Sequence, residues 1–252
     1  MARIRPRELA AGACAGLIGR RVDGLRWTGT ELSWVDGPGA RIQLGRMTPL
    51  GPRHTATLCL DGRVTSAVPA RDGWAVTGDP VLLRRDGRAR PLALPAADGA
   101  WCDPAGRLWL AGRDTLHRVD LSGTVHPVLG GPTHALAWSP DTATVYRVGA
   151  DGLTAHAFDL ANGTVGAGRV LTSTARGVAV DVDGFAWVAG GSGVRRIDGA
   201  GAAHSIVRLP DAVACCFAGE TMLITTADGT VHACDPGVRG LPAVRWAGVP
   251  TP

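Results

Sequence analysis

A unit of about 38 residues recurs along this chain, and its recurrence limits the possible fold more than any other feature of the sequence. Each unit has an apolar strand that ends in a turn, a second strand such as LWLAG or AWVAG, and a third strand that carries RVD or RID. The turns are rich in DG, GG, PD and DP pairs and helical periodicity is almost absent, which is typical of an all-β chain. The units begin at Asp23, Arg63, Asp98, His134, Arg176 and Asp211.

Six units of three or four strands, in steps of 40, 35, 36, 42 and 35 residues, predict a six-bladed β-propeller. One blade cannot bury both of its faces alone, whereas six blades in a ring can. No linker divides the chain, so we expect residues 1–252 to form one domain, with residues 1–20 completing the last blade as a closing strand. Tryptophans recur at equivalent strand positions and are expected to pack between blades: Trp27, Trp74, Trp109, Trp138 and Trp187.

Composition excludes several classes of function. The chain has no lysine, so all 26 basic residues are arginine, which excludes Schiff-base chemistry and a P-loop lysine. The net charge of +4 is small, the arginines are spread along the chain, and no nucleic-acid-binding motif occurs, so we expect no nucleic-acid partner. No apolar run approaches the length of a membrane span. We therefore expect a cytoplasmic protein that does not bind a membrane.

The cysteines are expected to be reduced thiols of the core, because no CxxC pair occurs and the chain is long enough to form a core without disulfides. Cys215 and Cys216 are adjacent, so we expect them to point to opposite faces of a strand. The six cysteines are Cys14, Cys59, Cys102, Cys215, Cys216 and Cys234.

The order of motifs resembles the senescence marker protein/gluconolactonase/regucalcin family, whose members are six-bladed propellers. Four patches carry the resemblance: DGLRWTGTELSWVD, DGAWCDPAGRLWLAG, HALAWSPDTATVYRV and ARGVAVDVDGFAWVAG. They resemble the family's opening G-E-x-P-x-W strand, its N-D-G-x-x-D-P-x-G-R, its N-G-L-x-W-S-x-D and its P-D-G-x-x-x-D-x-x-G-x-x-W-V-A. With ACCFAGETMLITTA in the last unit, the patches cover residues 23 to 227.

The resemblance implies a divalent metal at the tunnel mouth, held by a Glu, an Asn and an Asp from three blades. Asp23 stands at the Glu position, His134 at the Asn position and Arg176 at the Asp position. A guanidinium is repelled by a divalent cation and cannot become a ligand by losing its proton. We therefore expect no bound metal and no other cofactor, with a single calcium or zinc ion on Asp23 and His134 as the alternative.

The starts of the first strands line one end of a propeller's tunnel, so the six unit-start residues are expected to form a ring of charges there. That ring is either a salt-bridged plug or a polar pocket for a small molecule. In a pocket, Arg176 would bind a carboxylate or polarise a carbonyl, His134 would act as general acid or base, and Asp23 would orient it. Arg63 and Asp98 are the candidate substrate-binding residues: Arg63 is the rival of Arg176 for binding the anionic group, and the resemblance places the family's substrate-binding Asn on Ala97 or Asp98.

Two functions remain open. One is an enzyme of the gluconolactonase-like family that acts on a small anionic or carbonyl-bearing molecule, either as a lactonase-type hydrolase or as a metal-independent cyclase or isomerase. The other is a propeller that binds a small molecule or a partner at the tunnel mouth without chemistry. An open pocket with His134 exposed would favour the enzyme, and a tunnel closed by Arg–Asp pairs would favour the binding protein.

Overall fold

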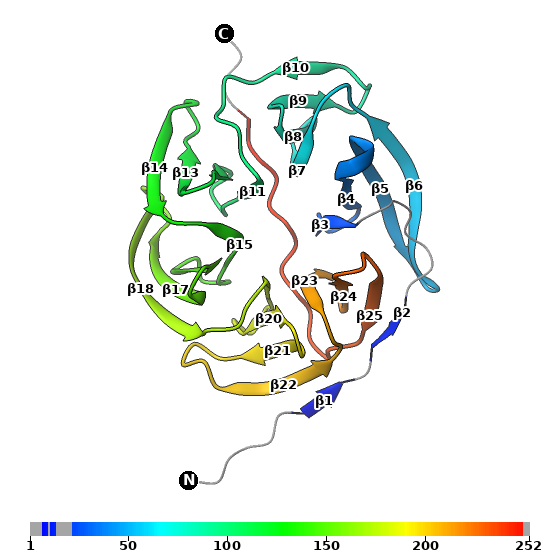
Figure 1. Ribbon diagram of the computed structural model, residues 1–252, viewed down its shortest axis with the longest axis vertical. Helices are drawn as coiled ribbons and strands as arrows, with labels where there is room; N and C mark the ends of the chain where they lie inside the picture. The colour runs from blue at the N-terminus through cyan, green and yellow to red at the C-terminus, as the bar shows by residue number, and fades with distance from the viewer. Residues whose placement is uncertain (1–6, 10, 14–21, 249–252) are drawn as a thin grey trace.

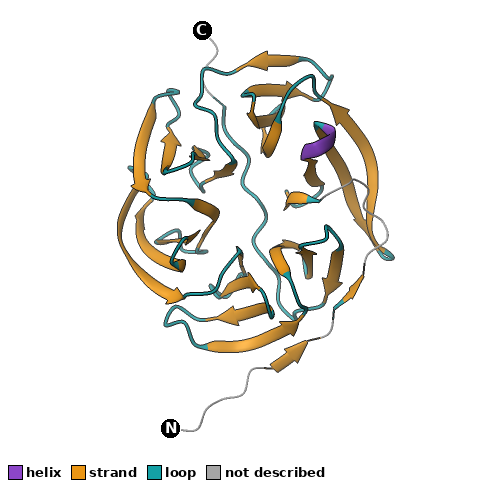
Figure 2. Cartoon of the chain, viewed as in Figure 1, coloured by secondary structure: helices purple, strands orange, loops and turns teal. Residues whose placement is uncertain are grey.

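The computed structural model describes residues 7–9, 11–13 and 22–248. Six sheets stand in a ring around a central tunnel, so the predicted six-bladed β-propeller is confirmed (Figure 1). The described residues contain one 3-10 helix, η1 (Gly37–Gly39), and no α-helix (Figure 2). None of their helical segments is therefore long and apolar enough to cross a membrane.

Blades 1 to 3 each have four antiparallel strands, which run in chain order from the tunnel outward. Blade 1 consists of β3 (Asp23–Trp27), β4 (Leu32–Asp36), β5 (Arg41–Thr48) and β6 (Gly51–Cys59). Blade 2 consists of β7 (Val64–Ala70), β8 (Gly73–Gly78), β9 (Val81–Arg84) and β10 (Ala89–Pro91). Blade 3 consists of β11 (Gly99–Cys102), β12 (Leu108–Ala111), β13 (Thr115–Val119) and β14 (Val125–Gly130).

Blades 4 to 6 follow the same order, and the N-terminal strands join two of them. Blade 4 consists of β15 (Thr133–Trp138), β16 (Thr144–Gly149), β17 (Gly152–Asp159) and β18 (Thr164–Thr172). Blade 5 consists of β19 (Gly177–Val180), β20 (Ala186–Gly190), β21 (Gly193–Ile197) and β22 (Ala203–Arg208), with β1 (Arg7–Leu9) parallel to β22. Blade 6 consists of β23 (Ala212–Ala218), β24 (Thr221–Thr226), β25 (Val231–Cys234) and β2 (Gly12–Ala13), which pairs with β25.

The second strand of a blade is the most deeply buried. Strands β4, β8, β12 and β20 have no exposed or half-buried residue, because each lies between two strands of its own sheet and under the neighbouring blades. A short continuous apolar run such as LWLA or AWVAG is typical of a strand buried on both faces. Trp74, Trp109 and Trp187 lie on these second strands and are buried, as predicted. Trp138, at the end of the first strand β15, is buried too, whereas Trp27 is half-buried and borders the tunnel.

A buried aspartate organises the turn after the first strand in blades 3 and 5. Asp181 accepts backbone N–H bonds from Asp183 (3.1 Å) and Phe185 (3.0 Å) on Oδ1. Its Oδ2 accepts from the indole of Trp187 (2.9 Å) and from Nε of Arg196 (2.8 Å). These bonds explain the D-x-D-G-x-x-W spacing, since one carboxylate closes the turn and fixes the core tryptophan of the next strand.

Blade 3 repeats this arrangement around Asp103, which is also fully buried. Its Oδ2 accepts from Nε1 of Trp109 (2.9 Å) and from Nε of Arg107 (2.7 Å). Gly106 stands in this turn at φ +84°, a conformation that glycine adopts without steric cost. The D-P-x-G-R motif is therefore a structural element of the blade.

A C-terminal segment, residues 236–248, crosses the centre of the ring, and we call it the strap (the orange-red trace in Figure 1). Its backbone N–H groups donate hydrogen bonds to carbonyl oxygens at the C-terminal ends of several first strands, or in the turns that follow these strands. Ala243 donates to Trp27 (2.6 Å), Leu241 to Val180 (3.0 Å), and other bonds of this kind join Gly240 to Gly219, Trp246 to Pro69 and Ala247 to Gly106. The strap therefore spans one end of the tunnel and links blades 1, 2, 3, 5 and 6.

Cysteine placement matches the sequence prediction in part. Cys102 and Cys234 are buried free thiols, whereas Cys59 is exposed at the end of an outer strand, so the prediction of a core thiol is wrong there. Cys215 packs with the cluster between blades 5 and 6, and Cys216 with the cluster between blades 6 and 1, so the two do point to opposite faces. Cys14 lies outside the described residues.

Candidate functional site

The tunnel is a cavity of about 890 Å³, lined by the first strands of all six blades. Leu241, Pro242, Ala243 and Val244 of the strap form part of its wall, so the tunnel is closed at the strap end. Its size lies within the roughly 300–1,000 Å³ of small-molecule sites. A blind pocket of this kind is shaped to receive a small ligand from the opposite end.

Four of the six unit-start residues line this cavity. Asp23 begins β3, Asp98 and Arg176 each precede a first strand by one residue, and His134 is the second residue of β15. Because the strap bonds to the far ends of the first strands, these four side chains lie at the opposite, open end. We call this end the mouth. His134, Asp98 and Arg176 are exposed, and Asp23 is half-buried.

A β-bulge sets the position of His134. Thr133 pairs with Gly149 and Ala135 pairs with Val148, so His134 is an extra residue with no partner on β16. A bulge of this kind bends the strand and re-aims a side chain. Thr65 and Val213 occupy the same place in blades 2 and 6, and both also line the cavity. The bulge therefore recurs in blades 2, 4 and 6, and in each it turns one residue of the first strand toward the tunnel.

The other two unit-start residues do not line the cavity. Arg63 donates to Asp98 (Nη2 to Oδ1, 3.2 Å), but their side chains are 68% and 70% exposed, so this ion pair contributes little to stability. Asp211 is exposed in a turn at φ +59°, where its N–H bonds to the carbonyl oxygen of Gly191 (3.1 Å). Of the expected ring of six residues, the four on blades 1, 3, 4 and 5 therefore border the cavity.

The Arg176 guanidinium is available to a ligand. No described acidic side chain lies within ion-pair distance of it, and its exposure leaves it in contact with water. The ion pair that the described residues do form at the mouth, Arg63–Asp98, joins blades 2 and 3 and is largely exposed, so it does not plug the cavity. The arrangement is instead that of a pocket with one fixed cation, one imidazole and two carboxylates at its mouth, a set suited to binding an oxyanion and moving a proton.

Among the polar residues of the tunnel interior that the sequence analysis did not assign to the site are Arg26, Cys102 and Cys216. Burial raises the pKa of the Cys216 thiol to about 12, and burial, with Asp103 adding to it, also raises the pKa of the Cys102 thiol. Both thiols are therefore protonated at neutral pH and are poor nucleophiles. The signal for Arg26 was an arginine inside the apolar strand DGLRW.

Comparison with known proteins identifies the family. A model of the family described as SMP-30/Gluconolactonase/LRE-like region matches residues 22–228. The chain belongs to this family. A search of curated proteins found no match.

Solved structures share the fold of this family member at low sequence identity. A luciferin-regenerating enzyme has a TM-score of 0.77 at 19% identity, and the match covers 94% of this chain and 99% of the other. A calcium-binding regucalcin from Agrobacterium tumefaciens has a TM-score of 0.75 at 16% identity, covering 98% and 100%. A gluconolactonase from Xanthomonas campestris has a TM-score of 0.71 at 19% identity, covering 86% and 87%. At these identities the likeness establishes the propeller alone.

The mouth residues do not fit the metal site that the resemblance implies. Of the three positions, Asp23 and His134 carry an oxygen and a nitrogen donor, but Arg176 carries a fixed positive charge and no donor electron pair. Among residues 7–9, 11–13 and 22–248, no three His, Cys, Asp or Glu side chains are grouped so that they could hold a metal ion. We therefore derive no chemical step through a metal here.

Proposed function

We propose that this family member is a lactonase-type hydrolase for a small carbonyl-bearing molecule, and that it works without a metal. The observation that carries the proposal is that Arg176, which forms no ion pair with a described residue, and an exposed His134 both line the mouth of one blind cavity. An open pocket with His134 exposed is the arrangement that favours an enzyme over a plugged tunnel. The names of the structural relatives, which include a gluconolactonase, support the same substrate class.

In this proposal Arg176 supplies the positive charge. Its planar guanidinium donates two parallel hydrogen bonds to the carbonyl oxygen and the neighbouring ring oxygen of a lactone, which polarises the carbonyl. Negative charge that develops on the carbonyl oxygen during attack is stabilised by the same donors. The charge is fixed before reaction, so no reorganisation is needed at that moment.

His134 moves the proton. Its neutral imidazole takes a proton from a water molecule, and the water oxygen attacks the carbonyl carbon. The ring C–O bond then breaks, and the leaving alkoxide takes the proton from the imidazolium, giving a hydroxy acid. Asp23 stabilises the imidazolium, and Asp98 orients the substrate hydroxyl groups. The thiols of Cys102 and Cys216 take no part, because they stay protonated.

The test is a pH-stat assay of a panel of γ- and δ-lactones, in protein treated with a chelator. We expect hydrolysis by the wild type and a loss of about 10²–10⁴-fold in His134→Ala, the range for a general base. Arg46→Ala, an exposed position on β5, is the control and keeps the wild-type rate. A folded His134→Ala variant with the wild-type rate would contradict the proposal.

A second function is favoured by one observation: apart from the residues at the mouth, the cavity is lined mostly by apolar residues. A propeller that only binds a small molecule would have these properties too. Binding of a lactone without its hydrolysis, seen by calorimetry on the same panel, would select this alternative.

A further inference from the structure

A second cation lies inside the tunnel, and the chemistry proposed at the mouth does not use it. Arg26 is on β3, three residues after Asp23, and its side chain lines the cavity. The next residue, Trp27, accepts the backbone hydrogen bond of Ala243 in the strap. Three residues of strand span at most about 10 Å. Arg26 is therefore deeper than Asp23 and lies beside the closed end.

Every hydrogen-bond partner that the described residues offer to the Arg26 side chain is uncharged. Its Nε donates to the carbonyl oxygen of Ala67 (3.0 Å), and its Nη2 donates to Oγ of Ser66 (3.4 Å) and to the carbonyl oxygen of Ala100. These partners belong to blades 2 and 3, so the side chain extends along the tunnel wall away from blade 1. Within the described chain, no carboxylate forms an ion pair with it.

The described residues around Arg26 provide no counter-ion. Removal from water lowers the pKa of its guanidinium to about 10, and only the thiols of Cys102 and Cys216 act in the opposite direction. Those thiols are protonated at neutral pH because burial raises their own pKa values. Arg26 is half-buried, and charges withdrawn from water in proteins are normally paired, because an unpaired one is costly. The guanidinium at the closed end thus keeps an unmatched positive charge, with Nη1 unbonded to any described residue.

We propose that Arg26 anchors an anionic group, a carboxylate or a phosphate, at the closed end of the tunnel. The ligand would enter with its anionic end first and leave its reacting end at Asp23, His134 and Arg176. The orientation rests on the proposed function, whereas anion binding at Arg26 does not. The substrate class is then narrower than a neutral lactone: an elongated molecule with an acid at one end and the reactive carbonyl at the other.

The test measures anion binding without turnover. Wild-type protein is titrated with inorganic phosphate and, separately, with acetate by calorimetry at low ionic strength. We expect one saturable site for at least one anion, and the anion that binds more tightly identifies the ligand group. Arg26→Met removes the charge but keeps a long apolar chain, and we expect binding at least tenfold weaker, because charge-assisted hydrogen bonds are lost. Arg90→Met, on the outermost strand of blade 2, is the matched control and binds as the wild type does.

A second variant tests the site without removing Arg26. Cys216 lines the cavity close enough to affect Arg26 electrostatically, so Cys216→Asp supplies an internal carboxylate. We expect this variant to fold and to lose anion binding. No saturable binding by the wild type, or wild-type affinity in folded Arg26→Met or Cys216→Asp, overturns the proposal. Anion binding that persists in His134→Ala shows that the Arg26 site does not depend on the proposed catalytic residues. The anion-binding proposal and the hydrolase proposal can then be contradicted independently.

Discussion

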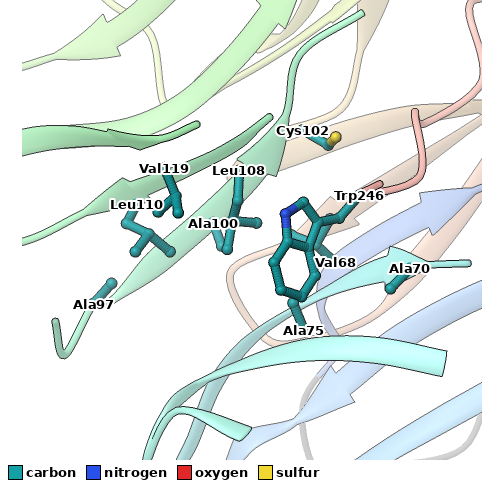
Figure 3. Packing of buried hydrophobic residues seen from close by; sticks show 10 residues of the cluster. All are labelled: Val68, Ala70, Ala75, Ala97, Ala100, Cys102, Leu108, Leu110, Val119 and Trp246. Atoms are coloured by element: carbon teal, nitrogen blue, oxygen red, sulfur yellow. The ribbon is translucent and has the colours of Figure 1, made fainter. Parts of the chain in front are cut away.

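The backbone N–H of Trp246 donates a hydrogen bond to the carbonyl oxygen of Pro69 at 2.8 Å, which fastens the strap to blade 2. The Trp246 side chain is 1% exposed and packs among residues of blades 2 and 3, including Val68, Ala75 and Leu108 (Figure 3). This contact fixes the C-terminal end of the described chain between blades 2 and 3. The strap is therefore an integral part of the core.

Trp246→Ala is expected to lower the free energy of unfolding by about 3–5 kcal/mol, the usual cost of truncating a buried tryptophan. Chemical denaturation of the purified variant measures it. Leu50→Ala is the control, because Leu50 is fully exposed, and its midpoint should match that of the wild type. Equal denaturation midpoints for both variants would mean that the packing of the strap does not contribute to the stability of the propeller.

Asp181→Asn is expected to destabilise the protein by about 3 kcal/mol, because it removes the charge that a partly buried Arg196 needs and weakens the bond to Trp187. Asp183 also pairs with Arg196 (2.9 Å), but its side chain is 58% exposed. Asp183→Asn should therefore cost less than about 1 kcal/mol. Thermal unfolding of the two variants compares them, and similar losses would refute the assigned role of the buried carboxylate.

Acid should destabilise the protein through its turn aspartates. Hydrogen bonds from the Ser122 hydroxyl and then His126 hold the pKa of Asp120 well below its usual range, and His204 is the largest cause of the lowered pKa of Asp198. A carboxyl whose pKa is lower in the folded state contributes stability above its unfolded pKa of about 3.9, and this is lost as pH falls through the folded value. The unfolding midpoint should thus decline below about pH 4.

Asp198→Asn isolates one of these contributions. Its midpoint should lie below that of the wild type at neutral pH, and the difference should shrink as pH drops below about 4. A difference that stays constant over the whole range would show that the lost hydrogen bonds, and not the titration of the carboxylate, account for the effect.

Much of the fold follows from the repeat. The unit starts inferred from the sequence lie within one residue of the first residues of β3, β7, β11, β15, β19 and β23. The prediction succeeds because each strand is short, apolar and bounded by turn residues. The sequence does not predict the strap, since LPAVRWAG lies outside the repeat and has no periodicity that marks its path across the tunnel.

The candidate site was predictable only where it coincides with the repeat. Asp23, Asp98, His134 and Arg176 were found as unit starts, and all four border the cavity. Arg26 was missed because its role depends on which carbonyl groups surround it in three dimensions. Sequence spacing likewise gives no sign that Asp211 turns away from the tunnel, which follows from its positive φ and its bond to blade 5.

Turnover by Arg176 variants tests the central claim, that a fixed guanidinium supplies the positive charge at the mouth. We expect Arg176→Gln to lower kcat by about two to three orders of magnitude, as is usual for loss of a preorganised donor. Arg176→Lys keeps a charge but loses the two-pronged geometry, so it should restore little of the rate. Folded Arg176→Gln and Arg176→Lys proteins that hydrolyse the same lactone at near wild-type kcat would contradict the account.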